Sequence, residues 1–178
     1  MHRYNINLSI VLVLILYSVT PAIAQQSEYV GEEHRGIKTL SEKEIEQYLS
    51  GAGMGFAKAA ELNHYPGPKH VLDLADTLGI SAEKKSVLEK IYVEMKANAI
   101  QAGKQILENE KVLNDAFSAG TISLTQLEHV TNKIGALQAK LRFTHLRAHL
   151  VTKSLMTKHQ IHLYDQLRGY YSDKVHEH

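Results

Sequence analysis

The chain has 178 residues, of which 44% are hydrophobic and none is cysteine, and its 20 lysines and arginines nearly balance 19 aspartates and glutamates. The lack of cysteine excludes a disulfide-stapled scaffold and a cysteine-based zinc module. The balanced charge argues against a nucleic-acid partner, because no excess positive charge is available to neutralise phosphates, and the hydrophobic content argues against a disordered chain.

Residues 1–24 have the pattern of a secretory signal peptide. Arg3 supplies a positive charge, an apolar run extends from Leu8 to Val19, and Ala22 to Ala24 forms a small-x-small cleavage site. The apolar run of about 12 residues is shorter than the roughly 20 that a membrane-spanning helix needs. We therefore predict export and cleavage after Ala24, which removes one basic residue and no acidic one and leaves a mature chain of zero formal charge.

Four expected helices begin with the same pattern, an apolar residue followed by serine or threonine. The candidate N-caps, whose hydroxyls can accept from N–H groups of the first turn, are Ser41, Ser81, Ser123 and Thr157. A capping box also needs Glu or Gln three residues later. The residues that meet this condition are Glu44, Gln126 and Gln160, whereas Lys84 breaks the pattern after Ser81.

The first helix is expected to begin after Ser41 and to meet a glycine-rich patch, residues 51–55. These glycines either break the helix or allow a neighbouring element to approach closely. The stretch 63–68, with its Pro-Gly-Pro sequence, predicts the strongest turn in the chain. A short helical piece over 70–78 follows and ends at Gly79, a residue type favoured just after a helix.

Two long helices are expected next, over 82–117 and 123–154, each with a stripe of apolar residues at helical spacing. The tight turn 118–121 makes them an antiparallel hairpin. A short last helix over 158–170 ends near Gly169. Because no alternating strand pattern occurs, we predict an all-α fold, a long antiparallel helical hairpin with an additional N-terminal helix and a short C-terminal helix.

The predicted domain organisation has one folded unit. The signal peptide covers 1–24, a flexible N-terminal segment covers 25–40, a single helical domain covers 41–170, and a disordered tail covers 171–178.

Histidine is the most over-used residue type, with 11 copies, and two of them lie on one helix face. His145 and His149 are four residues apart, so both rings are within reach of one ion. Counting back across the turn places Met95 roughly opposite them, and an imidazole pair with methionine or carboxylate suits zinc, nickel or copper. The alternative is two histidines that flank the core, one partly exposed and one hydrogen-bonded.

Two loop histidines are further candidate ligands. His64 and His70 flank the Pro-Gly-Pro turn, which could fold back over the hairpin, and Glu61 lies one helical turn before His64. We predict a metal site formed by His145, His149 and His64. The alternative for His64 is a loop histidine that caps backbone carbonyls.

The sequence offers no catalytic constellation. It has no nucleophilic cysteine, no G-x-S-x-G and no P-loop, and His145 is not followed by the glutamate of a zinc-protease motif. The glycines of residues 51–55 lack the preceding strand of a nucleotide-binding loop. We therefore predict no catalytic residues, no enzyme activity and no required cofactor.

The cysteine-free helical hairpin with a signal peptide resembles the Spy/CpxP family of periplasmic proteins, in which L-T-x-x-Q motifs open helices. The corresponding stretches are Ile80 to Lys84 and Met156 to Gln160, and the resemblance covers about residues 78–169. It implies a periplasmic location. It also implies either a stress-response chaperone that binds non-native envelope proteins without ATP, or a heavy-metal sensor or resistance protein.

We expect the chaperone function first and the metal-sensor function as its alternative. A second apolar stripe, Phe143, Leu146 and Leu150, could hold non-native proteins, or it could pack against the first and last helices. The expected partners are unfolded or envelope proteins, or a membrane-bound signalling protein. A homodimer is compatible with either function, and no nucleic acid is expected.

Overall fold

A computed structural model of the chain describes residues 26–171. The predicted signal peptide and all but the first residue of the predicted tail lie outside this range. Within it, none of the helices combines the length and the apolar character that a membrane span requires.

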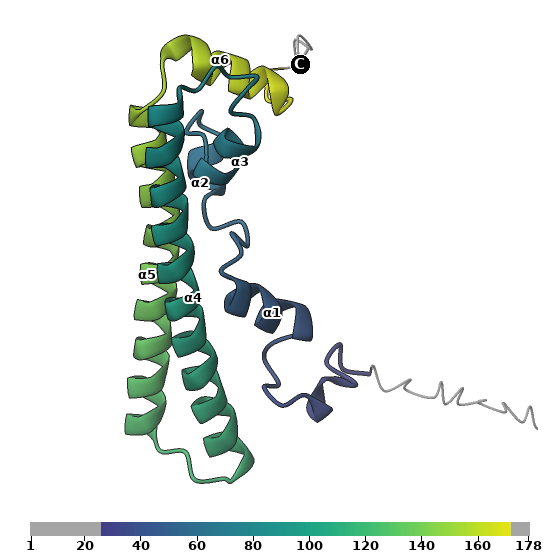
Figure 1. Cartoon of the computed structure of the whole chain (residues 1–178). Coiled ribbons are helices and arrows are strands. Elements are labelled where there is room, and N and C mark those ends of the chain that lie inside the picture. The colour runs from purple at the N-terminus through teal and green to yellow at the C-terminus, as the bar shows by residue number, and fades with distance from the viewer. Residues whose placement is uncertain (1–25, 172–178) are drawn as a thin grey trace, which may run out of the picture. The chain divides into compact units, whose positions relative to one another are not determined.

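The described residues form helices and no strands, which confirms the all-α prediction. Helix α4 (Ala82–Ser118) and helix α5 (Leu124–Ser154) pack antiparallel as a hairpin (Figure 1). The shorter elements are the 3-10 helix η1 (Glu32–His34) and helices α1 (Glu42–Ser50), α2 (Lys58–Glu61), α3 (Pro68–Asp73) and α6 (Lys158–Leu167). Helices α1 and α3 contact α4, and α2 and α3 contact α5.

The predicted caps start the helices because each hydroxyl accepts from the N–H group three residues later. This contact is present at all four candidates, Ser41, Ser81, Ser123 and Thr157. The reciprocal bond that completes a capping box forms at Ser41 with Glu44 and at Thr157 with Gln160. Each cap of this kind stabilises a helix by about 1 kcal/mol.

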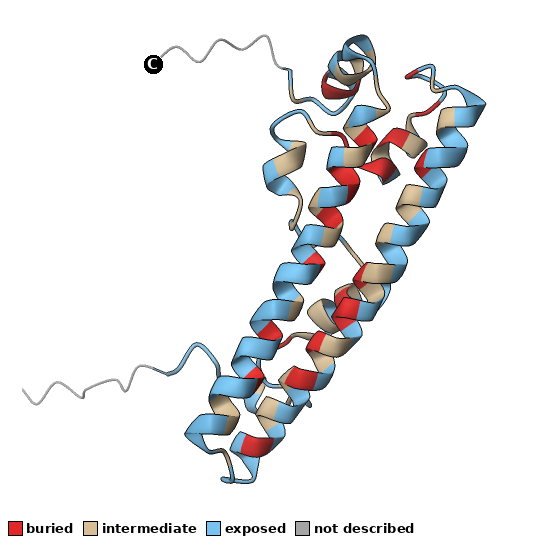
Figure 2. Ribbon diagram, turned by 90° about the vertical axis from the view of Figure 1, so that its left-hand side faces the viewer, coloured by how far each residue is buried: buried red, intermediate tan, exposed pale blue. Residues whose placement is uncertain are grey.

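The core follows the facing sides of the two long helices (Figure 2). One cluster joins α1 to the middle of the hairpin and contains Leu40, Tyr48, Ala99, Ala102, Ile106 and Leu141. A second cluster joins α3 and α6 to the start of α4 and contains Val71, Leu78, Leu88 and Tyr164. Because a fully buried side chain of this size contributes about 1.5–3 kcal/mol, these clusters fix α1, α3 and α6 on the hairpin.

Glycines allow both the break and the close approach that were open alternatives for the glycine-rich patch. Gly51 ends α1 in the left-handed conformation, with φ of +64°. The same glycine also lies close to α4, where an added Cβ atom would be 3.0 Å from the Lys96 carbonyl oxygen and 3.0 Å from the Ile100 side chain. On the α4 side, a Cβ atom at Gly103 would collide with the backbone of Tyr48. Residues 52–67 therefore leave α1 as an irregular connection that carries α2 to α5.

Part of the segment expected to be flexible makes contacts with α4. The Lys38 N–H donates to Asn114 Oδ1 at 3.3 Å, and the Thr39 hydroxyl donates to Glu110 at 3.1 Å. Leu40 is buried in the first core cluster.

Candidate functional site

A cavity of about 440 Å³ lies where α3, α4, α5 and the connection after α1 meet. Its lining includes His70, Tyr92, Met95, Lys96, His145 and His149. Glycines of the connection, Gly51, Gly53 and Gly67, form part of the wall. The structure therefore brings together the predicted histidine pair of α5 and the methionine expected opposite it.

The orientation of the His149 ring follows from its backbone partner. Its Nδ1 lies 2.7 Å from the carbonyl oxygen of Tyr65. Because a carbonyl oxygen can only accept, Nδ1 carries the proton of this hydrogen bond. Gly67 lies against the same ring, so that a Cβ atom at this position would be 2.9 Å from Nε2. The hydrogen bond and the close approach of Gly67 thus hold the ring in one orientation.

His145 is the more deeply buried member of the pair, with 3% of its surface exposed. The Phe56 ring stacks on it, with ring centroids 6.1 Å apart and planes 15° apart. Its Nε2 atom is buried and has no hydrogen-bond partner among the described residues. Burial, and then the neighbouring His149, lowers the pKa of His145, so its ring stays neutral and can offer a lone pair.

The third histidine in the cavity wall is His70, whereas His64 was the predicted one. His70 is half-buried, and this burial, followed by the charge of Arg168, lowers its pKa. His64 instead donates from Nδ1 to Asp165 Oδ2 at 2.8 Å and is about half exposed. The structure thus brings His145 and His149 together and leaves His64 with α6.

The histidine and carboxylate side chains do not by themselves form a complete metal-binding site. Among residues 26–171, no three His, Asp or Glu side chains converge closely enough to hold a metal ion. The wall of the cavity also contains Met95, whose thioether sulfur is a soft ligand.

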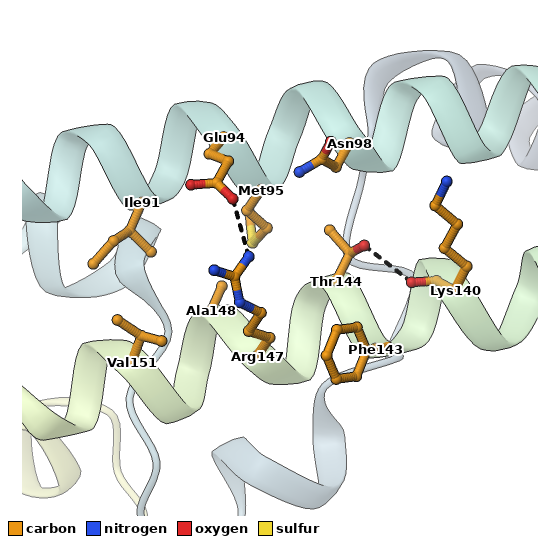
Figure 3. A pocket seen from close by; sticks show the side chains of 10 residues that line it. All are labelled: Ile91, Glu94, Met95, Asn98, Lys140, Phe143, Thr144, Arg147, Ala148 and Val151. Atoms are coloured by element: carbon orange, nitrogen blue, oxygen red, sulfur yellow. Dashed lines mark hydrogen bonds and ion pairs between the residues drawn. The ribbon is translucent and has the colours of Figure 1, made fainter.

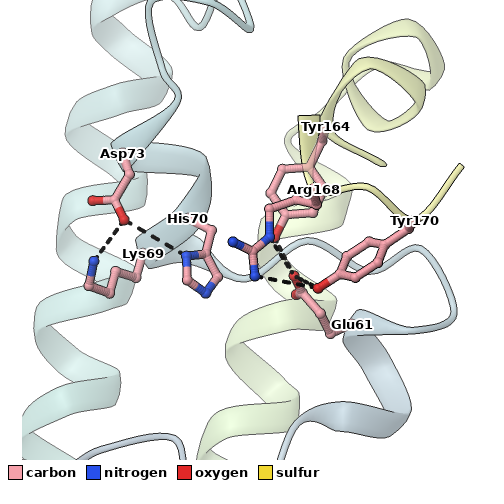
Figure 4. A network of polar contacts seen from close by, with 7 residues as sticks. All are labelled: Glu61, Lys69, His70, Asp73, Tyr164, Arg168 and Tyr170. Carbon is pink, nitrogen blue, oxygen red and sulfur yellow. Dashed lines mark hydrogen bonds and ion pairs between the residues drawn. The ribbon is translucent and has the colours of Figure 1, made fainter. Parts of the chain in front are cut away.

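Glu61, a further candidate ligand, is instead clamped by the end of α6 (Figure 4). Its Oε1 atom accepts from the Tyr164 hydroxyl at 2.5 Å and from the Tyr170 hydroxyl at 3.1 Å, and Arg168 Nε lies 3.5 Å away. Burial, and next its bond to Glu61, raises the pKa of Tyr164 far above its ordinary value, so the hydroxyl stays a donor. These partners are about 100 residues from Glu61 in sequence, and no local pattern could have revealed them.

A second surface feature is an apolar groove between α4 and α5 (Figure 3). Its volume is about 350 Å³, and Ile91, Met95, Phe143 and Val151 line it. An ion pair of 2.9 Å between Glu94 and Arg147 lies at its edge. Of the predicted second stripe, Phe143 is 64% exposed and Leu150 is 60% exposed, so packing against the first and last helices does not cover these two.

Comparison with protein-family models, with curated proteins and with solved structures found no match for this chain. The site must therefore be interpreted from its own chemistry.

Proposed function

We propose that this is an exported periplasmic protein that binds a soft transition-metal ion, copper(I), through His145, His149 and Met95. The observation that carries the proposal is the buried Nε2 atom of His145, which has no hydrogen-bond partner among the described residues, in a residue that lines a cavity with His149 and Met95. A buried polar atom left without a partner costs about 1–3 kcal/mol and calls for an explanation. A metal ion would satisfy this atom.

Copper(I) is favoured over zinc and nickel by the available ligands. Imidazole suits all three metals, but a thioether favours copper(I), and zinc and nickel are better served by carboxylate, thiolate or further imidazole ligands. The lowered pKa of His145 favours its neutral ring, which is the form that binds copper. Such a site is suited to sequestering the copper ion or to sensing it. A sensor would pass the signal to a membrane-bound partner.

An anaerobic competition titration with a coloured copper(I) chelator tests the proposal. The wild type should take up one ion, and the double variant His145→Ala/His149→Ala should lose at least about 100-fold in affinity, because even removing a group that only supports a metal ligand costs 10–100-fold. Met95→Leu, which conserves volume, should weaken copper(I) more than zinc. The matched control is the double variant His129→Ala/His159→Ala, which removes two exposed histidines elsewhere. Equal affinity in the wild type and the His145/His149 variant would refute the metal site.

We propose the binding of non-native polypeptides without ATP as a second function, supported by the exposed Phe143 beside the α4–α5 groove. An apolar groove with charged residues at its edge suits extended, partly apolar segments. At stoichiometric ratios, the wild type should suppress the aggregation of a chemically unfolded envelope protein, and Phe143→Ser should weaken this effect. Phe117→Ser, at an exposed phenylalanine near the end of α4, is the control. Unchanged aggregation in the presence of the wild type would remove this function.

A further inference from the structure

The segment 61–67 contacts a proposed copper ligand on one side. The Tyr65 carbonyl accepts from His149 Nδ1 at 2.7 Å, and the Lys153 ammonium lies 3.5 Å from the centroid of the Tyr65 ring. Gly67 lies close to the same imidazole, because a Cβ atom added there would be 2.8 Å from Cε1 of the ring. The orientation of the His149 ring therefore depends on the position of this segment.

The same segment is bound to α6 on its other side. Glu61 accepts from the hydroxyls of Tyr164 and Tyr170, and His64 donates to Asp165. Tyr164 and Asp165 are almost completely buried, at 0% and 2% exposure, so the α6 partners of Glu61 and His64 in these two bonds are shielded from solvent. The segment thus lies between the histidine and the C-terminal helix and is bonded to both.

The two carboxylate oxygens of Glu61 face different partners, one on the α6 side and one on the His149 side. Oε1 holds the α6 groups, whereas Oε2 is buried, has no hydrogen-bond partner among the described residues and lies 3.5 Å from His149 Nδ1. His149 Nδ1 therefore donates to the Tyr65 carbonyl at 2.7 Å, and the Glu61 Oε2 atom lies a little farther away, at 3.5 Å. A carboxylate or carbonyl behind a ligating histidine fixes its ring and raises its basicity.

We propose that Glu61 is a positioning residue that couples the copper site to the docking of α6, an inference that rests on the proposed copper function. Copper on His149 Nε2 makes the Nδ1–H group a stronger donor to Tyr65 and Glu61, which tightens the segment and with it α6. Because coupling between two sites is reciprocal, undocking of α6 lowers copper affinity by the same factor. Helix α6 is then the element through which occupancy is communicated.

Copper titrations of three variants test the coupling. Glu61→Gln keeps the shape and removes the charge, and its copper(I) affinity should fall about 10–100-fold, as for other groups that hydrogen-bond to a metal ligand. Tyr170→Phe acts from the α6 side without touching the cavity and should produce a smaller fall. Asp115→Asn, at an exposed carboxylate of α4 that pairs with Lys111 and does not line the cavity, is the control and should bind like the wild type.

Two further measurements separate positioning from a purely structural role. Copper(I) should raise the hydrogen-exchange protection of residues 158–168 in the wild type, and this gain should be lost in Glu61→Gln. The imidazole nitrogen NMR signals of His149 should show a protonated Nδ1 in the wild type. If Glu61 had only a structural role, Glu61→Gln would be less stable but would keep both the copper-induced protection and the protonated Nδ1 of His149. That result would overturn the assignment of Glu61 as a positioning residue.

A copper-free arm keeps the two proposals distinguishable. Without copper, His149→Ala should lower the protection of α6, because it frees Tyr65, and His145→Ala should not. Copper binding with unchanged α6 protection and with wild-type affinity in Glu61→Gln would overturn the coupling and leave the copper site standing. Absence of copper binding, with the His149→Ala effect retained, would overturn the copper site and support the mechanical link from His149 to α6.

Discussion

Replacing Gly67 with alanine tests how closely the Pro-Gly-Pro turn is fitted to the His149 ring. The added Cβ atom would lie 2.8 Å from Cε1 and 2.9 Å from Nε2 of that ring. Ordinary contacts begin near 3.4 Å, so the ring or the turn must move by roughly 0.6 Å. The ring cannot move freely, because it is buried and its Nδ1 is bonded to Tyr65 in the same turn.

Two opposing effects set the size of the change. The backbone at Gly67 is extended, with φ of −83° and ψ of 146°, so alanine fits the conformation. Replacing glycine in a compatible conformation stabilises by about 0.4–1 kcal/mol through the unfolded chain. Overpacking a filled site costs about 1–3 kcal/mol. The clash outweighs the gain from the unfolded chain, and the free energy of unfolding should fall by about 1–2 kcal/mol.

Urea unfolding followed by far-UV circular dichroism measures the effect. Gly53→Ala is the matched control, since Gly53 lines the same cavity but a Cβ there would meet nothing within 4 Å. That variant should be unchanged or more stable by up to about 1 kcal/mol. Equal stability of the two variants would show that the imidazole does not lie against Gly67, and the orientation assigned to His149 would be wrong.

The remaining predictions concern the α1 contact and the buried histidine. Gly103→Ala should lower the free energy of unfolding by about 1–3 kcal/mol and release α1, because the added Cβ atom would collide with the Tyr48 backbone. Gly135→Ala is the control, since a Cβ atom there would meet nothing within 4 Å. Hydrogen exchange at α1 should increase in the first variant only. The pKa of His145 is lower in the folded protein than its ordinary value of 6.5, so the unfolded chain takes up a proton first as the pH falls. The free energy of unfolding is therefore fully retained above pH 6.5 and decreases as the pH falls below 6.5. Unfolding titrations of the wild type should therefore show a loss of up to about 1.4 kcal/mol per pH unit in that window that His145→Phe reduces.

The helices were predictable because their signals are local. A hydroxyl at a cap and an apolar stripe act within a few residues, so the predicted ranges 82–117 and 123–154 differ by one residue each from the observed α4 and α5. The antiparallel hairpin follows from the short turn between them. The same reasoning placed His145 and His149 on one face, and both line the same cavity.

The part of the site built by residues 51–68 could not be predicted in the same way. This connection has no hydrophobic period, and its path depends on single backbone conformations such as the positive φ of 63° at His64. That conformation is compatible with the bond of His64 to Asp165, a residue 101 positions later, while His70 comes to the cavity wall. Sequence spacing contains no information on which of two loop histidines will make such a distant contact.

The most direct test of the copper site is the X-ray absorption spectrum of the protein loaded with equimolar copper(I). We expect the copper ion to be surrounded by imidazole nitrogens and one sulfur atom. The sulfur contribution should be lost in Met95→Leu, and the nitrogen contribution should be lost in His145→Ala/His149→Ala. A spectrum without sulfur that neither variant changes would contradict the proposed copper site.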